Sequence, residues 1–273
     1  MNFSKIEGVD VTLENHLLTI RIARPERLNA LTPDQMNYIS RICAGAEEDN
    51  DVRVVVIAGN PGAFCSGADL TDTDLSSEGG QIPPVSMGRN LFLSLLELSK
   101  PLIAAVEGVA AGGGLGLALC CDIRIASTQA RFATSFSRIG ITANDTVAWL
   151  LPRIVGTAKA LELIYNARPI DAVEAERIGL VSYVYQEADF QENLTNYLRH
   201  LLEAPPVAIR FSKRLVIDGL NRSYREHVLA QEYASLANRV LADNDIAEGL
   251  SAFREKRPPR FQGSQKEPRW QNY

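Results

Sequence analysis

Glycines fill positions 112 to 114 of the stretch AAGGGLGLALCCD, and an apolar run with helical spacing follows them. Small residues at the start of a helix leave unpaired N–H groups that, with the helix dipole, attract a negatively charged oxygen. A dinucleotide-binding loop is excluded because its third glycine would fall on Leu117 or Leu119. A P-loop is excluded because no lysine occurs between Lys100 and Lys159. The spacing therefore predicts a site for an oxyanion rather than for a phosphate.

A second loop of the same kind occurs in FCSGADL, where Gly67 and Ala68 follow another apolar, β-branched segment. Each loop alone is equally consistent with a tight turn at which two backbones pass close together. Both loops stand at the end of a predicted buried strand, and this shared context favours a functional pair. We therefore predict that the two loops donate N–H groups to one oxygen.

The segments that position these loops alternate between strands and helices. Apolar, β-branched runs predict strands at 9–13, 17–23, 52–59, 101–108, 122–126, near residue 132 and at 180–185. Helices are predicted at 33–48, after a capping box at Thr32, and at about 86–98. The polar segment 71–85 is typical of a surface loop, and helical patterns dominate after residue 187. Repeated units of strand, loop and helix indicate either a wound parallel sheet or a β-spiral.

Composition narrows the function classes. The chain has 273 residues and a net charge of -5, and its basic residues are dispersed among acidic ones, so we expect no nucleic-acid partner. No apolar stretch approaches the roughly 20 residues that span a bilayer, so we expect a cytoplasmic protein without membrane contact. The cysteines, which lie in apolar contexts, are predicted to be buried thiols: Cys43, Cys65, Cys120 and Cys121. His, Cys, Asp and Glu show no metal-ligand spacing, so no metal site is expected.

Four segments together resemble the enoyl-CoA hydratase/isomerase, or crotonase, superfamily: FCSGADL, VEGVAAGGGLGLALCCDIRIA, RPERLNAL and AFREKRPPRF. The likeness extends over nearly the whole chain. It implies an α/β fold with a ββα spiral core over residues 1–190 and a C-terminal helical region over 191–273. It also implies an acyl-CoA substrate, no cofactor apart from the coenzyme A of that substrate, and assembly as a homotrimer or a dimer of trimers.

The same resemblance assigns roles to individual residues. It implies that the N–H groups of Ala68 and Gly113 hold the thioester oxygen. The residues that it places along the coenzyme A channel are Arg27, Leu28, Ala30, Ser66 and Asp69. Two more, Phe253 and Lys256, are expected to contact the nucleotide end of coenzyme A, from the same or a neighbouring subunit.

The two glutamates with which the family's hydratases add water are missing. Their positions fall on Gly116, three residues after the oxyanion glycine, and on Phe136, four residues after Phe132. Glycine and phenylalanine cannot activate a water molecule. Hydration by that pair of glutamates is therefore disfavoured.

The next candidates lie in SRIGITANDTVAWLLPRIVG, which looks like the ring-epoxide isomerases of phenylacetate degradation, the dienoyl-CoA isomerases and 4-chlorobenzoyl-CoA dehalogenase. Their aspartate aligns with Asn144, and Asp145 follows one place later. A shift of one residue in the loop would put Asp145 in the catalytic place. Alternatively, Asn144, Asp145 or Thr146 caps the helix that begins at VAWLL.

The acyl pocket is predicted to be apolar, since four large side chains flank these candidates: Phe132, Phe136, Ile141 and Trp149. Core packing would demand similar residues. Three functions follow for the chain. The first is an acyl-CoA isomerase with Asp145 as proton shuttle. The second is a thioester, diketone or aryl-halide hydrolase that uses an aspartate, and the third is a catalytically silent acyl-CoA-binding subunit.

Overall fold

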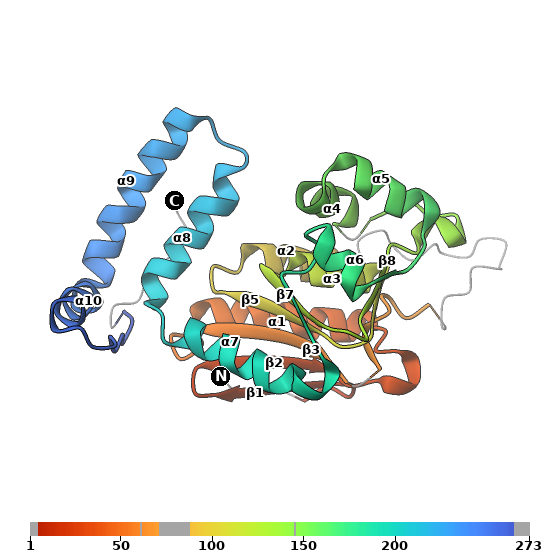
Figure 1. Ribbon diagram of the computed structural model, residues 1–273, viewed down its shortest axis with the longest axis horizontal. Coiled ribbons are helices and arrows are strands. Elements are labelled where there is room, and N and C mark those ends of the chain that lie inside the picture. The colour runs from red at the N-terminus through yellow and green to blue at the C-terminus, as the bar shows by residue number, and fades with distance from the viewer. Residues whose placement is uncertain (1–4, 61, 71–87, 145, 265–273) are drawn as a thin grey trace.

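The computed structural model describes residues 5–60, 62–70, 88–144 and 146–264, and its strands form two sheets with helices around them (Figure 1). The predicted loop at 71–85 lies outside the described residues. The six strands of the larger sheet are, in spatial order, β1 (Val9–Glu14), β2 (Leu17–Ile22), β3 (Val54–Gly59), β5 (Leu102–Val106), β7 (Ile123–Ser127) and β10 (Tyr183–Tyr185). Only β1 and β2 pair antiparallel; the other neighbours in this sheet are parallel.

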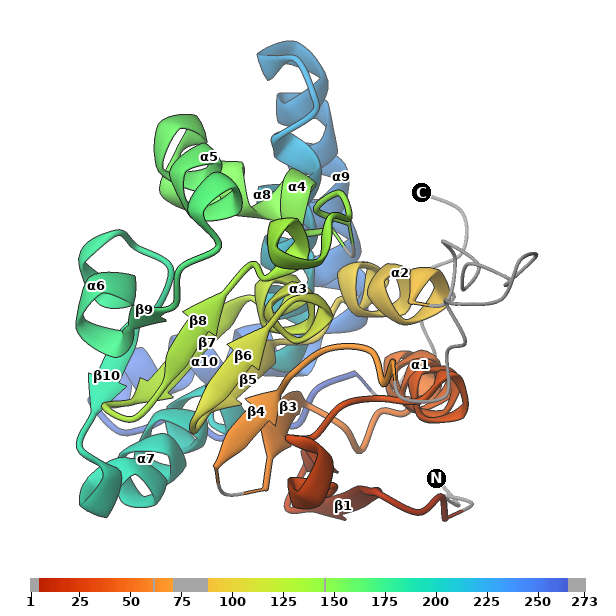
Figure 2. The same cartoon turned by 90° about the vertical axis from the view of Figure 1, so that its right-hand side faces the viewer.

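The smaller sheet consists of very short strands that lie side by side in Figure 2. They are β4 (Ala63–Cys65), β6 (Val109–Ala111), β8 (Arg131–Ala133) and β9 (Ile170–Asp171). Successive turns of the chain place one strand in each sheet: β3 is followed by β4, β5 by β6, and β7 by β8. Two of these turns are followed by a helix among the described residues: α2 (Arg89–Glu97) comes after β4, and α3 (Gly113–Cys120) comes after β6. This repetition confirms the ββα spiral and excludes the wound single sheet.

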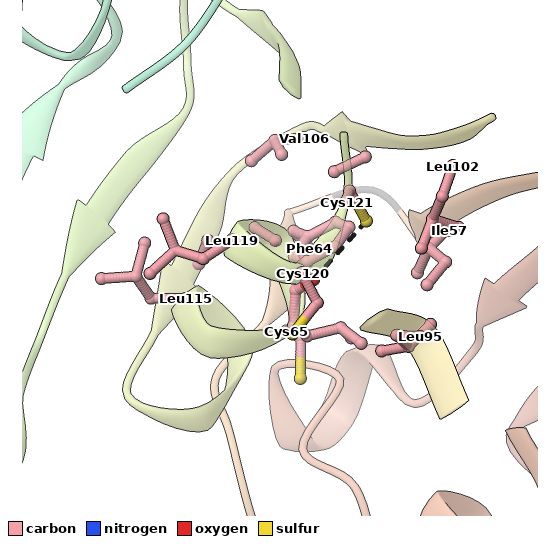
Figure 3. Packing of buried hydrophobic residues seen from close by; sticks show 14 of the residues in the cluster. Ile57, Phe64, Cys65, Leu95, Leu102, Val106, Leu115, Leu119, Cys120 and Cys121 are labelled. Carbon is pink, nitrogen blue, oxygen red and sulfur yellow. Dashed lines mark hydrogen bonds between the residues drawn. The ribbon is translucent and has the colours of Figure 1, made fainter. Parts of the chain in front are cut away.

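The helices of the spiral pack on the sheets through apolar faces. Helix α1 (Pro33–Glu48) begins at the predicted capping box, in which Thr32 and Gln35 satisfy each other's backbone N–H groups. Buried residues of α1, α2 and α3 join those of the sheets in one apolar cluster, part of which Figure 3 shows around Phe64, Leu95 and Leu115. The predicted burial of all four cysteines is confirmed.

The C-terminal helices leave the spiral. Helix α7 (Phe190–Leu202) packs on the larger sheet through Phe190, Leu194 and Leu198. The next two, α8 (Pro206–Gly219) and α9 (Tyr224–Leu241), form a hairpin that projects from the core, and α10 (Asp243–Glu255) lies at its base (Figure 1). The domain boundary between residues 190 and 191 stays a prediction, since α7 itself belongs to the packed core.

A buried group of charges fastens α8 to the spiral. Arg210 of α8 lies 2.7 Å from the Glu47 carboxylate of α1 and also donates to the Ser99 hydroxyl. Lys213 of α8 lies 2.8 Å from Asp122, the residue before β7. These pairs are largely shielded from solvent, so breaking one would leave an uncompensated charge in a poorly hydrated place. No helix in the described part of the chain is long and apolar enough to cross a membrane.

Candidate active site

The FCSGADL loop, residues 66–69, follows β4 and is held in place by hydrogen bonds to Leu31. The Leu31 N–H donates to the Gly67 carbonyl at 2.8 Å, and the Asp69 N–H donates to the Leu31 carbonyl at 2.9 Å. Leu31 and Ala68 thus form a parallel β-bridge. In such a bridge Leu31 bonds to the residues on either side of Ala68, so the Ala68 N–H points away from Leu31. No described residue accepts a hydrogen bond from the Ala68 N–H. One donor at the end of β4 is therefore available to a ligand.

The glycine loop at residues 112–114 connects β6 to α3. Gly112 has φ +52 and donates to the Ala133 carbonyl of β8 at 3.0 Å, which ties the start of α3 to the smaller sheet. Gly113 is the first helical residue, where an N–H has no intrahelical acceptor. No described residue accepts from it. The helix dipole adds partial positive charge at this same end.

The two loops touch each other. A β-carbon on Gly67 would lie 3.1 Å from the Gly113 nitrogen, and one on Gly114 would lie 1.9 Å from the Cys65 carbonyl oxygen. At residue 114 only glycine permits this approach, and at residue 67 a β-carbon would require the loops to shift. Pairing of β4 with β6 sets the approach, because Cys65 and Ala110 are partners in that ladder. The two loops lie in contact, and no described residue accepts a hydrogen bond from the N–H of Ala68 or of Gly113. That both N–H groups donate to one oxygen stays a prediction.

The residues expected along the coenzyme A channel lie together beside the 66–69 loop. The Ser66 N–H donates to the Leu28 carbonyl at 3.0 Å, and the Ser66 hydroxyl to the Arg27 carbonyl at 3.4 Å. Asp69 pairs with Arg24 at 2.9 Å, and the same guanidinium donates to the carbonyl of Ala30. Segments 24–31 and 65–69 thus form one surface, although coenzyme A contact stays a prediction.

Asn29, which the sequence did not single out, anchors this surface. It adopts a left-handed conformation with φ +55 and is fully buried. Its side-chain amide donates to the Ala63 carbonyl at 2.6 Å and its side-chain oxygen accepts from the Arg24 N–H at 2.8 Å. Asparagine tolerates left-handed backbone better than other non-glycine residues. The neighbouring Leu28, also left-handed, is consequently turned outward and is 53% exposed.

The two residues assigned to the nucleotide end of coenzyme A lie elsewhere in the chain. Phe253 is 84% exposed on α10, and Lys256 follows that helix in a left-handed conformation. Figure 1 places α10 far from α3 and from α4 (Val147–Val155). Within one chain, these residues do not join the surface made by 24–31 and 65–69.

The turn before α4 carries the candidate proton-transfer groups. Asp145 lies outside the described residues. The Asn144 side-chain oxygen is buried and has no hydrogen-bond partner among the described residues, whereas its backbone carbonyl accepts from the Val147 N–H at 2.9 Å. Thr146 occupies the N-cap of α4 but its side chain makes no capping bond. The alternative that Asn144 or Thr146 caps the helix through its side chain is therefore wrong.

The four large side chains proposed for the acyl pocket divide into two classes. Phe132 and Phe136 are buried in the apolar cluster, so packing accounts for them. Ile141 is 48% exposed and Trp149 is 42% exposed, so core packing does not explain either. The Arg153 guanidinium covers the Trp149 ring at 4.0 Å from its centroid, a cation–π contact.

Comparison with known proteins adds an independent line of evidence. The family model described as enoyl-CoA hydratase/isomerase matches residues 12–265. The chain belongs to this family. It is 36% identical to mitochondrial methylglutaconyl-CoA hydratase of Mus musculus, covering 90% of this chain and 80% of the relative. It is 32% identical to 1,2-epoxyphenylacetyl-CoA isomerase of Escherichia coli K12, covering 92% and 97% respectively.

A solved structure agrees in fold. The enoyl-CoA hydratase from Bacillus anthracis superposes with a TM-score of 0.88 at 30% identity, covering 94% of this chain and all of that one. The enoyl-CoA hydratase/isomerase family comprises enzymes that act on acyl-CoA thioesters, and the fold and family predicted from the sequence are confirmed. Relatives named as hydratases and as isomerases both match, so similarity alone leaves the reaction open.

The two positions to which the resemblance assigns the acid and base of the hydratases carry no titratable group. Gly116 is buried on α3, one turn from Gly113 and on the same face. Phe136 is buried in a short 3-10 helix (Phe136–Ile139). Neither position can exchange a proton with a substrate or with water.

Other reactive groups are occupied or shielded. Burial raises the pKa of the Cys65 thiol to about 12, so it is no nucleophile at neutral pH. Glu107, also raised in pKa by burial, accepts a hydrogen bond from Gln191 at 2.8 Å. His16, in the turn between β1 and β2, forms a hydrogen bond with the backbone carbonyl of Asp51. Among the described residues, no group of His, Cys, Asp and Glu is placed to hold a metal ion.

Proposed function

We propose that this family member isomerises the double bond of an unsaturated acyl-CoA. The observation that carries the proposal has two parts. The N–H groups of Ala68 and Gly113 have no acceptor among the described residues, and Gly116 and Phe136 carry no acid or base. Hydration by the family's pair of glutamates needs two carboxyl groups. Migration of a double bond needs one group that removes a proton from one carbon and returns it to another.

Each step balances without a co-reactant. The Asp145 carboxylate takes a proton from a carbon next to the double bond, and the electron pair left behind delocalises to the thioester oxygen as a dienolate. The Ala68 and Gly113 N–H groups stabilise that oxygen, and removal of one such donor typically costs about 3 kcal/mol of barrier. The carboxylic acid of Asp145 then returns the proton to the far end of the conjugated system. The substrate and product are isomers, so no water is consumed.

Isotopes distinguish this reaction from its competitors. The purified chain would be given 2-enoyl- and 3-enoyl-CoA thioesters in D2O and, separately, in ¹⁸O-labelled water. We expect the double bond to migrate, with deuterium entering at carbon and no ¹⁸O in the product. Incorporation of ¹⁸O at carbon would indicate hydration, and in a released carboxylate it would indicate hydrolysis. Either result as the main product contradicts the proposal.

A substitution tests the shuttle itself. Asp145→Asn should abolish isomerisation because an amide cannot accept the proton, while the dissociation constant of a saturated acyl-CoA stays within about twofold. Unchanged turnover would exclude Asp145 as the shuttle. Binding without turnover by the wild type would instead support a silent acyl-CoA-binding subunit.

We also propose that the chain acts as a homotrimer or a dimer of trimers. Helix α9 has no buried residue, and its spacing of seven between Leu229 and Leu236 places both, about half exposed, on one face with Tyr233 and Val240. A monomer rarely exposes an apolar stripe of this kind. Phe253 and Lys256 would then reach the coenzyme A channel of a neighbouring copy. Multi-angle light scattering of the purified chain measures the assembly.

A further inference from the structure

Arg24 connects the two segments that meet in the bridge between Leu31 and Ala68. Its Nη1 donates to the Ala30 carbonyl at 2.7 Å and lies 2.9 Å from the Asp69 carboxylate. Ala30 directly precedes Leu31 in one segment, and Asp69 directly follows Ala68 in the other. One guanidinium nitrogen therefore contacts both sides of the bridge, each time at the residue next to the bridged pair.

The bridge itself has little support from the sheets. Leu31 and Ala68 pair in a single bridge outside the strands of both sheets. A ladder of several pairs fixes the direction of each N–H group in it, whereas this bridge depends on two main-chain hydrogen bonds, at Gly67 and Asp69. A small rotation of the peptide units around Ala68 would redirect its N–H. A side-chain contact at Asp69 restricts such a rotation, because Asp69 is the next residue along the chain.

The ion pair between Arg24 and Asp69 is largely shielded from solvent. The side chain of Asp69 is 9% exposed and that of Arg24 is 18% exposed. Gly8 makes room for the aliphatic part of Arg24, since a β-carbon on Gly8 would lie 2.6 Å from Arg24 Cγ. The Arg24 N–H is fixed as well, because it donates to the Asn29 side chain at 2.8 Å. Arg24 is thus held along its length, and charge-assisted hydrogen bonds of this kind are stronger than neutral ones.

We propose that Arg24 is a positioning residue, whose guanidinium fixes the direction of the Ala68 N–H by tying Asp69 to Ala30. The inference rests on the proposed function in one respect, namely that this N–H binds the thioester oxygen. In this role Arg24 exchanges no proton and acts through the main chain of residues 68 and 69. A donor aimed at developing charge loses much of its effect when it is misplaced, so the contribution of Arg24 should appear in turnover.

Arg24→Met removes the guanidinium and keeps an unbranched side chain. The Asp69 carboxylate then lies in a shielded place without this cation, so it should turn toward water and rotate the loop with it. We expect kcat to fall at least about tenfold while KM changes by less than about threefold, the pattern of an interaction made in the transition state. Adding Asp69→Asn removes the uncompensated charge and should raise kcat at least about threefold above Arg24→Met alone.

A milder variant covers the case in which Arg24→Met does not fold. Arg24→Lys keeps a positive charge beside Asp69, but a single ammonium cannot reproduce the fork of a guanidinium. It should fold and lower kcat by about threefold or more, with KM nearly unchanged. Wild-type kcat in Arg24→Lys, together with an unfolded Arg24→Met, would overturn the positioning role.

Arg210→Met is the matched control. It breaks an ion pair of similar length and shielding, since Arg210 lies 2.7 Å from Glu47 and these side chains are 7% and 20% exposed. Both residues lie outside the two glycine loops, in α8 and α1. Arg210→Met should therefore lower the melting temperature about as much as Arg24→Met does and leave kcat unchanged.

The direction of the donor also has a spectroscopic signature. Butyryl-CoA labelled with ¹³C at the thioester carbonyl is bound to each protein, and its C=O stretch is measured by isotope-edited infrared difference spectroscopy. A hydrogen bond to the carbonyl oxygen lowers this frequency. We expect a downshift in the wild type and in Arg210→Met, a smaller one in Arg24→Met, and partial recovery when Asp69→Asn is added.

The proposed function and the role of Arg24 fail in different ways. The absence of a downshift in the wild type would show that the loops do not bind the thioester oxygen, and it would overturn both. A wild type that hydrates overturns the isomerase proposal alone, because hydration uses the same oxygen-binding donors. The role of Arg24 is overturned if either the kcat or the downshift of a folded Arg24→Met matches the wild type, if its loss appears in KM alone, or if Arg210→Met loses as much kcat.

Discussion

Gly67→Ala adds one methyl group at the contact between the two glycine loops. The new β-carbon would lie 3.1 Å from the Gly113 nitrogen and 3.2 Å from the Ala111 carbonyl oxygen. Both distances are shorter than ordinary van der Waals contact, so the loops must separate by a few tenths of an ångström. The Gly113 N–H is one of the two donors proposed to hold the thioester oxygen. Its displacement should weaken stabilisation of the enolate.

The expected loss lies below that of deleting a donor. Complete removal of an oxyanion donor lowers kcat by about 10² to 10³. A partial displacement should lower kcat roughly 10- to 100-fold, which corresponds to about 1.4 to 2.7 kcal/mol of barrier. Alanine at φ +109 also strains the backbone, at a cost on the order of 1–3 kcal/mol of folding stability.

Gly62→Ala isolates the strain from the displacement. Gly62 has φ +100, but a β-carbon there would have no atom within 4 Å. Both variants should therefore lower the melting temperature, and only Gly67→Ala should lower kcat strongly. Turnover of the enoyl-CoA substrate, thermal denaturation by circular dichroism and calorimetric binding of a saturated acyl-CoA make the comparison. Equal turnover losses in the two variants, or full turnover in Gly67→Ala, would refute the role of the loop contact.

Three further outcomes are expected. Burial lowers the pKa of Lys100 to about 8, so between pH 8 and 10.5 the unfolded chain binds more protons than the folded one, and the free energy of unfolding should rise with pH. The rise, at most about 3 kcal/mol by urea denaturation, should be absent from Lys100→Met. Arg210→Met should destabilise the chain by about 3–5 kcal/mol because Glu47 loses its ion-pair partner, and thermal and urea melts measure this. Leu229→Lys combined with Leu236→Lys should reduce the particle mass in light scattering, and an unchanged mass would exclude the α9 face as an interface.

Local signals allowed the larger elements to be predicted. Thr32 and Gln35 mark the start of α1 through a contact only three residues long, so the sequence suffices to place it. Strand β3 is buried on both faces, and its run of β-branched residues reflects that burial directly. Each glycine loop directly follows such an apolar run, so the sequence also indicates that the two loops occupy equivalent places in the fold.

Elements fixed by distant contacts could not be predicted. Strands β4 and β6 are three residues each and exist because Ala63 and Val109 meet across the smaller sheet. No local pattern indicates them, since a three-residue strand is too short to show alternation. The segment 180–185 was expected to be a strand, but only Tyr183–Tyr185 pairs with β7, whereas Leu180 and Val181 are buried before it.

The turn before α4 shows the same limit within the candidate site. Capping preferences offered, as the alternative to a catalytic role, a side-chain cap at Asn144, Asp145 or Thr146, because all three types favour that place. Asp145 lies outside the described residues. The packing of α4 on α3 overrides this preference and directs the Thr146 hydroxyl to Cys120.

Both donors proposed to bind the thioester oxygen are main-chain N–H groups, and this has a practical consequence for mutational surveys. Residue 68 is already alanine, and alanine at residue 113 would keep its N–H. An alanine scan can therefore pass over the centre of the site while reporting large effects at its borders. Replacement of the amide by an ester at these two positions, by chemical synthesis or expressed ligation, removes the hydrogen-bond donor alone. In this chain the two N–H groups proposed to bind the reacting oxygen cannot be deleted by replacing the side chains of residues 68 and 113, although Gly67→Ala can displace one of them.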